Sequence, residues 1–525
     1  MKTLPLLILP LLLCSCLGRA ETAADPRPDW RARIAESRAA LVAKDPAHAL
    51  TAVRAALALS LAFPSGDADH AATLALLAEI LSLADDPAAA EAAYRKALEA
   101  FAAGPAADSL PAADCRTGLV RQLVACGRLA EAETQEREAL AIRSKRLGAD
   151  ADACGISDAM LADLLRIEGH ERDAEALYQR ALAIWAAHGS DRDGNAAAAH
   201  QGLAELALGR GDAATARTHL ERSLEILEQC NGVSSPSLVM VLIDRADACL
   251  RSGEQARAEG DLKRALTIID GSNLAHAPVA ADALEPLAGI HAQDGRTSDA
   301  TAELARAIAI RRQDAGGDPR RLGRCLIAYA ELKRSAGAAE DALTAYQAAL
   351  AHWQAHGADD PATLAAVLNG LAASLARLQR YTEAEPLLAH ALALLEHSEG
   401  PTHEALAVIL ANQSQLYACE EKWPQAIASG VRLLGILESH GGTDCRDYVT
   451  ALNAVIAACA AGADYEQAIA LNRRAIAIVE RTLGAADPNL ATTLQNCAVL
   501  LKQAGRPQEA VAMESRAAVI LASTH

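Results

Sequence analysis

The stretch RDAEALYQRALAIW, from Arg172 to Trp185, decides the fold because close copies of it return along the chain. EAEPLLAHALALL, which begins at Glu383, and QAIALNRRAIAIV, which begins at Gln467, keep the same order of small, charged and large apolar residues. A domain built around one core gives no reason for such repetition. A fixed period is typical of stacked repeats that bury their apolar faces against one another.

The period is 42 residues, measured between alanines that open the second helix of each expected repeat. Eleven alanines keep this spacing without a break: Ala90, Ala132, Ala174, Ala216, Ala258, Ala300, Ala342, Ala384, Ala426, Ala468 and Ala510. A twelfth repeat lies upstream, where DPAHALTAVRAAL from Asp45 matches DPAAAEAAYRKAL from Asp86 at an offset of 41 residues. We number each repeat so that this anchor alanine is position 20.

Each repeat is predicted to hold two helices of about 15 residues joined by a turn. Glycine, which suits the left-handed residue that ends a helix, marks this turn at Gly127, Gly169, Gly211, Gly253, Gly295, Gly337 and Gly505. A second alanine commonly follows seven residues after the anchor, and a large residue such as Tyr178 or Leu388 stands between the two. We expect the small residues to allow close helix contacts and the large residue to fill the gap between repeats. The repeat anchored at Ala426 departs from this pattern, because Gly430 and Leu433 replace the large and small residues.

The pattern of two small residues with a tyrosine or leucine between them resembles the tetratricopeptide repeat. The 42-residue period and the LGxxDP string between repeats resemble the kinesin-light-chain type, whose first-helix signature is similar to LNGLA from Leu368 and LQNCAVL from Leu494. The resemblance covers residues 30 to 525 and implies an all-α, right-handed α-solenoid of about twelve stacked helix-turn-helix repeats. It also implies a non-catalytic scaffold without cofactors, whose first helices line a concave groove that binds a protein or peptide.

By the same resemblance, positions 2, 5, 6, 9, 12 and 13 of each repeat face the groove. In the last third of the chain these positions carry side-chain amides, which can pair with a peptide backbone without reading its side chains: Asn369, Asn412, Gln415, Asn453, Gln495 and Asn496. In the first two-thirds, position 9 is mainly acidic and would attract a basic or extended segment: Glu79, Asp163, Glu205, Asp247 and Glu331. Solvated side chains on an exposed face are the competing interpretation of both sets.

Charge and motifs point away from nucleic acids and from catalysis. The net charge is −18, whereas phosphate binding needs a basic surface. HExxH, GxSxG and a phosphate-binding glycine loop are all missing from the sequence. His352 and His356 have the spacing of two metal ligands on one helix. However, His188, His356 and His440 share one repeat position, each before a glycine, where a cation favours a helix C-terminus. We therefore expect helix capping and no metal site.

Residues 1–15 are predicted to be a signal peptide, because Lys2 precedes an apolar run that is too short to span a bilayer. The string LCSC, which ends at Cys16, resembles a bacterial lipobox, and a lipid on this cysteine would anchor the protein to the membrane surface. Ordinary cleavage after Ala20 is the alternative that the sequence leaves open. A linker would follow over residues 16–29. Either route predicts an exported protein, periplasmic or membrane-anchored and facing the periplasm or exterior.

Two functions remain open at this stage. The first is protein or peptide binding in the groove, in the bacterial cell envelope. The second is a structural component that forms oligomers through its termini or its convex face. The string VAMESRAAVILASTH supports the second, because solenoids need a polar outer face at each end and Val519, Ile520 and Leu521 are apolar. Another copy, a partner or fraying of the helix would account for them.

Overall fold

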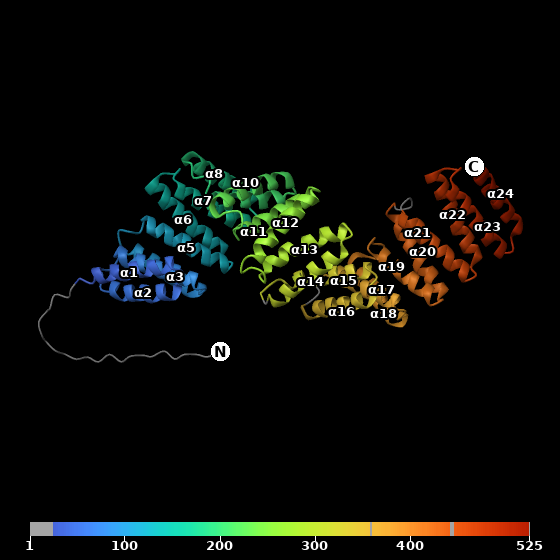
Figure 1. Ribbon diagram of the computed structural model, residues 1–525, viewed down its shortest axis with the longest axis horizontal. Coiled ribbons are helices and arrows are strands. Elements are labelled where there is room, and N and C mark those ends of the chain that lie inside the picture. The colour runs from blue at the N-terminus through green and yellow to red at the C-terminus, as the bar shows by residue number, and fades with distance from the viewer. Residues whose placement is uncertain (1–24, 315, 357–359, 442–445, 524–525) are drawn as a thin grey trace. The chain divides into compact units, whose positions relative to one another are not determined.

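The computed structural model describes residues 25–314, 316–356, 360–441 and 446–523. Over these ranges it contains twenty-four helices and no strand (Figure 1). The helices alternate as first and second helices of twelve repeats, so the predicted all-α repeat fold is confirmed. The predicted signal peptide and Cys16 lie outside the described residues.

The chain divides into two compact parts, one up to Gly253 and one from Glu254. The N-terminal part contains α1 (Arg27–Val42), α2 (Pro46–Ser60), α3 (Ala68–Leu83), α4 (Pro87–Ala102), α5 (Leu110–Ala125), α6 (Leu129–Leu147), α7 (Asp152–Ile167), α8 (Glu171–His188), α9 (Gly194–Gly209), α10 (Ala213–Asn231) and α11 (Leu238–Arg251). The C-terminal part contains α12 (Gln255–Asp270), α13 (Pro278–Gln293), α14 (Thr297–Gln313), α15 (Pro319–Ser335), α16 (Ala339–His356), α17 (Pro361–Arg377), α18 (Tyr381–Glu399), α19 (Leu406–Cys419), α20 (Trp423–Ser439), α21 (Arg446–Ala461), α22 (Tyr465–Leu483), α23 (Pro488–Gln503) and α24 (Pro507–Ser523).

Aspartates and prolines fix where many of these helices begin. The carboxylate of Asp487 accepts a hydrogen bond from the backbone N–H of Asn489, and proline follows it as the first residue of α23. Asp464 accepts in the same way from the N–H of Gln467 at the start of α22. The side-chain oxygen satisfies an N–H group that has no partner inside the helix, and the fixed φ of proline suits the first turn.

The turn inside each repeat ends the first helix with one residue in the left-handed region. The seven predicted glycines all take it, with φ between 73° and 84°. The other five repeats place a residue with a side chain at the same position, with φ between 58° and 60°: Lys44, Asp85, Gln379, Glu421 and Ala463. The repeat geometry therefore imposes this conformation whether or not the residue is glycine.

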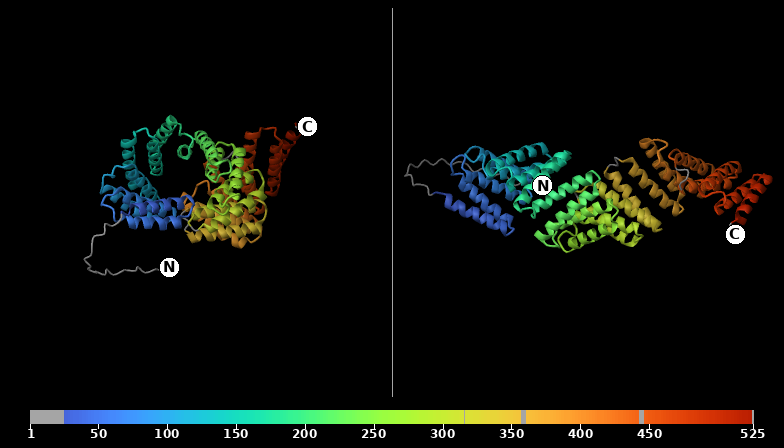
Figure 2. Two further views of the ribbon diagram at one scale, coloured as in Figure 1. Left: turned by 60° about the vertical axis from the view of Figure 1, so that its left-hand side comes forward. Right: turned by 90° about the horizontal axis from the view of Figure 1, so that it is seen from above.

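Small residues form the helix contacts, as predicted. All eleven anchor alanines have no exposed surface, and the second alanines are buried as well. Each helix packs against its neighbours in chain order within its part (Figures 1 and 2). First helices of successive repeats also contact one another, as α15 and α17, α17 and α19, and α19 and α21 do. Among the described residues, no helix combines the length and apolar character needed to cross a bilayer.

The residue at position 24, between the two small residues, packs against position 6 of the following repeat. Where the first residue is a tyrosine, the second is small. A tyrosine at position 24 faces a glycine, because a Cβ there would overlap the ring: Tyr94 with Gly118, Tyr178 with Gly202, and Tyr346 with Gly370. Where position 24 is Leu304 or Leu388, position 6 carries a side chain, Ala328 or Asn412. Tyrosine at position 24 thus fills the space between first helices, as predicted, whereas Leu388 at the same position leaves part of this space open.

Candidate functional site

The predicted amide residues lie on four consecutive first helices of the C-terminal part: Asn369 on α17, Asn412 and Gln415 on α19, Asn453 on α21, and Gln495 and Asn496 on α23. The Nδ2 of Asn412 donates a hydrogen bond of 2.8 Å to the Oδ1 of Asn369, which links neighbouring repeats. This leaves the Asn369 NH₂ group as a donor and the Asn412 oxygen as an acceptor. Asn453, Gln495 and Asn496 are exposed. The six residues therefore form an amide column, the name used for them below.

Four residues of the amide column line three clefts, whereas Asn369 and Gln495 line none of these three. The first, of about 320 Å³, lies between α17, α18 and α19 and is lined by Asn412 and Gln415. The second, of about 360 Å³, lies between α19, α20 and α21 and is lined by the same two residues. The third, of about 990 Å³, lies between α21, α22 and α23 and is lined by Asn453 and Asn496. Amides therefore stand on the walls of successive clefts.

Position 24 lines each of these clefts. The residue is Leu388 in the first, Gly430 in the second and Asn472 in the third. By contrast, the ring of Tyr346 fills the space beside Gly370. A residue smaller than tyrosine at position 24 thus leaves room between first helices. Gly430, which departs from the repeat pattern, is packed closely, because a Cβ there would overlap the side chain of Val455.

The predicted acidic residues are mostly engaged with neighbouring side chains. The hydroxyl of Tyr178 donates to Asp163, and the hydroxyl of Tyr346 donates to Glu331 over 2.5 Å. Arginine partners lie near four of the five carboxylates: Arg166 near Asp163 (3.9 Å) and Glu205 (2.5 Å), Arg251 near Asp247 (2.9 Å), and Arg334 near Glu331 (2.7 Å). Glu79 is exposed. Burial and the Glu331 carboxylate raise the pKa of Tyr346, so this hydroxyl stays protonated and keeps donating.

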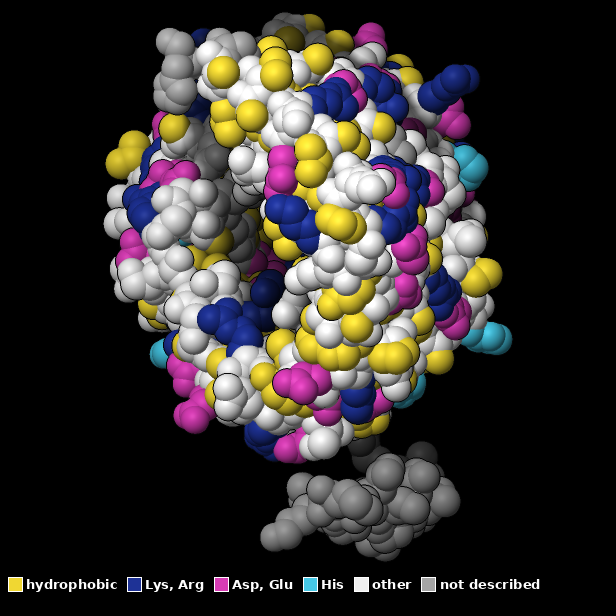
Figure 3. All heavy atoms as spheres, turned by 90° about the vertical axis from the view of Figure 1, so that its right-hand side faces the viewer, with side chains coloured by type: hydrophobic (Ala, Val, Ile, Leu, Met, Phe, Trp, Pro, Cys, Tyr) yellow, Lys and Arg dark blue, Asp and Glu magenta, His cyan; other side chains and the backbone are white. Residues whose placement is uncertain are grey.

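Four of these carboxylates, Glu79, Asp163, Glu205 and Asp247, belong to the N-terminal part, and Glu331 belongs to the C-terminal part. On the face drawn in Figure 3, acidic and basic side chains are intermixed. At position 9 itself, Arg166, Arg251 and Arg334 offset much of the negative charge.

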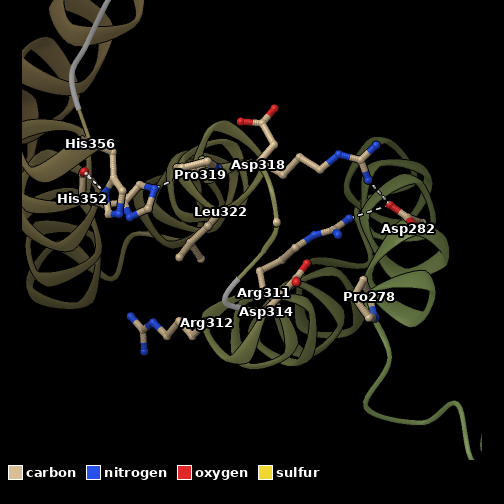
Figure 4. A pocket seen from close by; sticks show the side chains of 12 residues that line it. Pro278, Asp282, Arg311, Arg312, Asp314, Asp318, Pro319, Leu322, His352 and His356 are labelled. Carbon is tan, nitrogen blue, oxygen red and sulfur yellow. Dashed lines mark hydrogen bonds and ion pairs between the residues drawn. The ribbon is translucent and has the colours of Figure 1, made fainter. Parts of the chain in front are cut away.

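A fourth pocket, of about 540 Å³, contains the two histidines with metal-ligand spacing (Figure 4). The Nε2 of His352 donates to the carbonyl of Pro319 over 2.7 Å, and the Nδ1 of His356 donates to the carbonyl of His352 over 2.9 Å. His440 donates to the carbonyl of Ile436 in the same way, so His356 and His440 cap their helices as predicted. The Nδ1 of His188 instead contacts the carboxylate of Asp152. Within the described ranges, no three His, Cys, Asp or Glu side chains are placed to hold a metal ion.

One residue of the third cleft escaped the sequence prediction. Asn472 is only 3% exposed, and its carboxamide oxygen has no hydrogen-bond partner among the described residues. The available signal was an asparagine at position 24, where most repeats carry tyrosine or leucine.

Two family models, each described as a tetratricopeptide repeat, together match about half of the chain, at residues 112–150, 195–270, 363–439 and 447–520. BtubC (BKLC) from P. vanneervenii is similar at 24% identity over 43% of this chain and 90% of that chain, with a TM-score of 0.36. A putative kinesin light chain from Podosopora anserina, with nearly identical TPR-like repeats, is similar at 20% identity over 39% of this chain and 97% of that chain, with a TM-score of 0.34. The apo form of RapI is similar at 13% identity over 70% of this chain and 98% of that chain, with a TM-score of 0.47.

No curated protein matches the sequence. The family assignment rests on the two family models, which agree with the twelve helix pairs described above. The chain belongs to the tetratricopeptide-repeat proteins, which are typically non-catalytic scaffolds that mediate protein–protein interactions.

Proposed function

We propose that the protein is a non-catalytic scaffold that binds an extended peptide or protein segment across α17, α19, α21 and α23. The observation that carries this proposal is the amide column, because Asn412 and Gln415 each line two neighbouring clefts. Amides both donate and accept hydrogen bonds, so they suit the alternating N–H and C=O groups of an extended backbone. The clefts between them take side chains.

The spacing of the repeats is compatible with an extended ligand. Packed helices lie about 8–10 Å apart, and an extended chain advances about 3.3 Å per residue. One repeat therefore accommodates about three residues of the ligand. Successive clefts would receive side chains at this interval.

The linings favour a ligand segment of low charge. Of the side chains that the structure describes, Asp447 is the one charged residue that lines the second cleft, and Arg334 and Arg377 are the two that line the first. A basic segment is favoured less, because arginines already pair with four of the five position-9 carboxylates.

The test combines Asn412→Ala with Asn453→Ala. A partner captured from a cell-envelope extract is identified by mass spectrometry, divided into overlapping peptides and measured by calorimetry. We expect the double variant to weaken the best peptide at least about tenfold while the protein keeps its melting temperature and oligomeric state. Gln313→Ala, an exposed amide outside the clefts, is the matched control. Equal affinity of the double variant and the control would contradict the proposal.

A structural or assembly role is the second candidate, and the surface of α24 favours it. Val511 and Val519 on this helix are 58% and 70% exposed. Ile520 is 5% exposed, so its substitution would disturb packing and would not report on a surface. Val519→Asp is the sharper test. If the protein assembles through α24, light scattering will show a wild-type oligomer that this variant dissociates, while the amide-column variants have no effect.

We also propose that the protein is exported and held at the membrane by a lipid on Cys16. The LCSC string supports this proposal. Cys16→Ser is expected to shift the protein from the membrane fraction to the soluble periplasmic fraction or to leave an unprocessed precursor. An unchanged distribution would favour cleavage after Ala20.

A further inference from the structure

Among the described residues, no charged side chain lines the third cleft, unlike the other clefts and the histidine pocket described above. Charged residues make up 22% of the chain, yet this lining consists of aliphatic, hydroxyl and amide side chains. Asn453, Asn489, Asn496 and Gln503 contribute amides, and Ile456, Val499 and Leu500 contribute apolar surface. Such a site suits a group that forms hydrogen bonds but carries no charge.

Asn472 is the polar group that the fold leaves unsatisfied in this lining. It is 3% exposed, and its Oδ1 is buried without a hydrogen-bond partner in the described structure. An unpaired buried acceptor lowers stability, and most buried polar groups in proteins have partners. A ligand group that enters the cleft can supply the missing hydrogen bond.

Comparison between repeats shows how this position is satisfied elsewhere. In two repeats, position 24 is a tyrosine whose hydroxyl donates to the carboxylate at position 9: Tyr178 to Asp163 and Tyr346 to Glu331. In the repeat of Asn472, position 9 is Ala457, which lines the same cleft and cannot form a hydrogen bond through its side chain. Position 9 therefore offers Asn472 no side-chain partner, and the open third cleft lies beside both residues.

We propose that the third cleft is a specificity pocket for a neutral carboxamide, the side chain of asparagine or glutamine in the bound segment. This inference rests on the proposed peptide-binding function. A carboxamide both donates and accepts, so it can pair with Asn472 and with the amides of the walls. A carboxylate would lose its hydration without meeting a cation, and an aliphatic side chain would leave Asn472 unpaired.

The first test uses three fluorescent twelve-residue peptides of alternating alanine and serine, with glutamine, glutamate or leucine at the centre. Anisotropy against the full chain is expected to show the glutamine peptide binding at least about tenfold more tightly than the other two. Asn472→Leu should abolish this preference and retain the weaker binding of the leucine peptide. Leucine occupies position 24 in other repeats, so the variant is expected to fold, with a higher melting temperature.

Ala457→Gln is the second variant, because the NH₂ group of a glutamine at position 9 can donate to the Oδ1 of Asn472 from within the fold. It too should remove the glutamine preference. Equal binding of the three peptides to the wild type, or a preference that survives in both variants, would overturn the inference. Asn369→Ala with Asn412→Ala separates the two proposals, since it should weaken all three peptides alike and keep the preference for glutamine.

A small probe tests the pocket even if no peptide binds. Propionamide is titrated into the ¹⁵N-labelled full chain, with propionate as the charged control of the same size. We expect the side-chain NH₂ signal of Asn472, assigned by its loss in Asn472→Leu, to shift saturably with propionamide alone. Without this shift, or with an equal shift for propionate, the cleft is not a carboxamide pocket. If the shift occurs but no peptide binds, the peptide-binding proposal fails and the pocket remains.

Discussion

At the residue scale, the most demanding position is the left-handed residue that ends each first helix. A residue with a Cβ is strained there by roughly 1–2 kcal/mol, and five of the twelve repeats carry such a residue. Glycine avoids this strain but loses more backbone freedom on folding. The balance of these two effects can be measured directly in this chain.

Ala463→Gly should raise the free energy of unfolding, because it removes the strain of a φ of 60°. We expect an increase of about 0.5–1 kcal/mol after the entropic cost of glycine is subtracted, measured by urea unfolding. Gly505→Ala is the matched reverse change and should lower the free energy of unfolding by a similar amount. Apart from its two chain neighbours, no described residue lies within 4 Å of a Cβ at Gly505, so its effect reports on the backbone alone. A loss of stability in Ala463→Gly would contradict the prediction.

At the element scale, the residue at position 24 of a second helix determines which residues fit at position 6 of the next first helix. Tyr346 on α16 lies against Gly370 on α17, and its hydroxyl reaches Glu331 on α15. Three helices thus meet around one tyrosine. Leu388, at the same position in the next repeat, leaves the first cleft open. The same pair of positions therefore determines both how the helices pack and where clefts form on the surface.

Gly370→Ala should destabilise the protein by about 1–3 kcal/mol, because the added methyl group overlaps the Tyr346 ring. In a Tyr346→Leu background the same substitution should cost much less. A double-mutant cycle, followed by chemical unfolding, would then show a coupling of about 0.5–3 kcal/mol. Additive effects would mean that the two side chains do not share this space.

Glu259 connects α12 to the following helix pair and makes the free energy of unfolding depend on pH. Its Oε1 accepts from Lys263 at 2.7 Å, from Arg296 at 2.8 Å and from His291 at 3.3 Å. The Lys263 and Arg296 hydrogen bonds lower the pKa of Glu259 to about 2. The ionised carboxylate therefore stabilises the fold above its ordinary pKa of 4.5, and this contribution is lost as the pH falls from 4.5 towards 2.

Glu259→Gln should accordingly lower the free energy of unfolding by about 0.5–1 kcal/mol at pH 7, a small effect because the site is partly solvated. The difference from the wild type should shrink as the pH falls from 4.5 to 2. Urea unfolding at a series of pH values measures it, and Glu466→Gln, a more exposed carboxylate, serves as control. A constant difference between the variant and the wild type over this range would rule out the assigned role.

At the scale of the whole molecule, substantial helix contacts join helices that are one or two places apart in the chain. Stability in such a protein is close to a sum of terms from each repeat and from its interfaces with neighbouring repeats. A local defect should therefore spread to adjacent helices and no further. This behaviour distinguishes a stack of repeats from a protein with one shared core.

Ala216→Leu tests this expectation, because Ala216 has no exposed surface at the contact that it makes. Overpacking should cost about 1–3 kcal/mol. Hydrogen–deuterium exchange should become faster in α8 to α11 and stay unchanged in α17 to α24. Unchanged thermal stability would show that the repeat register is wrong, and faster exchange throughout would exclude independent repeats.

The period, the helix pairs, the left-handed turns and the buried alanines could be predicted because each depends on residues close together in one repeat. The partners of the acidic residues could not, because the contact of Tyr346 with Glu331 or of Arg166 with Glu205 depends on how long side chains turn between helices. The placement of the amide residues on successive first helices followed the pattern. The cleft around Asn472 could not be predicted, since its size depends on how α21, α22 and α23 pack and its chemistry depends on Ala457, which offers Asn472 no partner.

The matching of tyrosine with glycine also constrains the order in which these repeats can evolve. Converting a closed junction, such as Tyr346 with Gly370, into an open one, such as Leu388 with Asn412, requires two substitutions. Replacing the tyrosine first leaves a void that the protein survives with some loss of stability. Replacing the glycine first passes through a steric clash. New recognition pockets in this protein should therefore evolve in a fixed order. The tyrosine at position 24 is replaced first, and the glycine at position 6 is replaced by an amide residue afterwards.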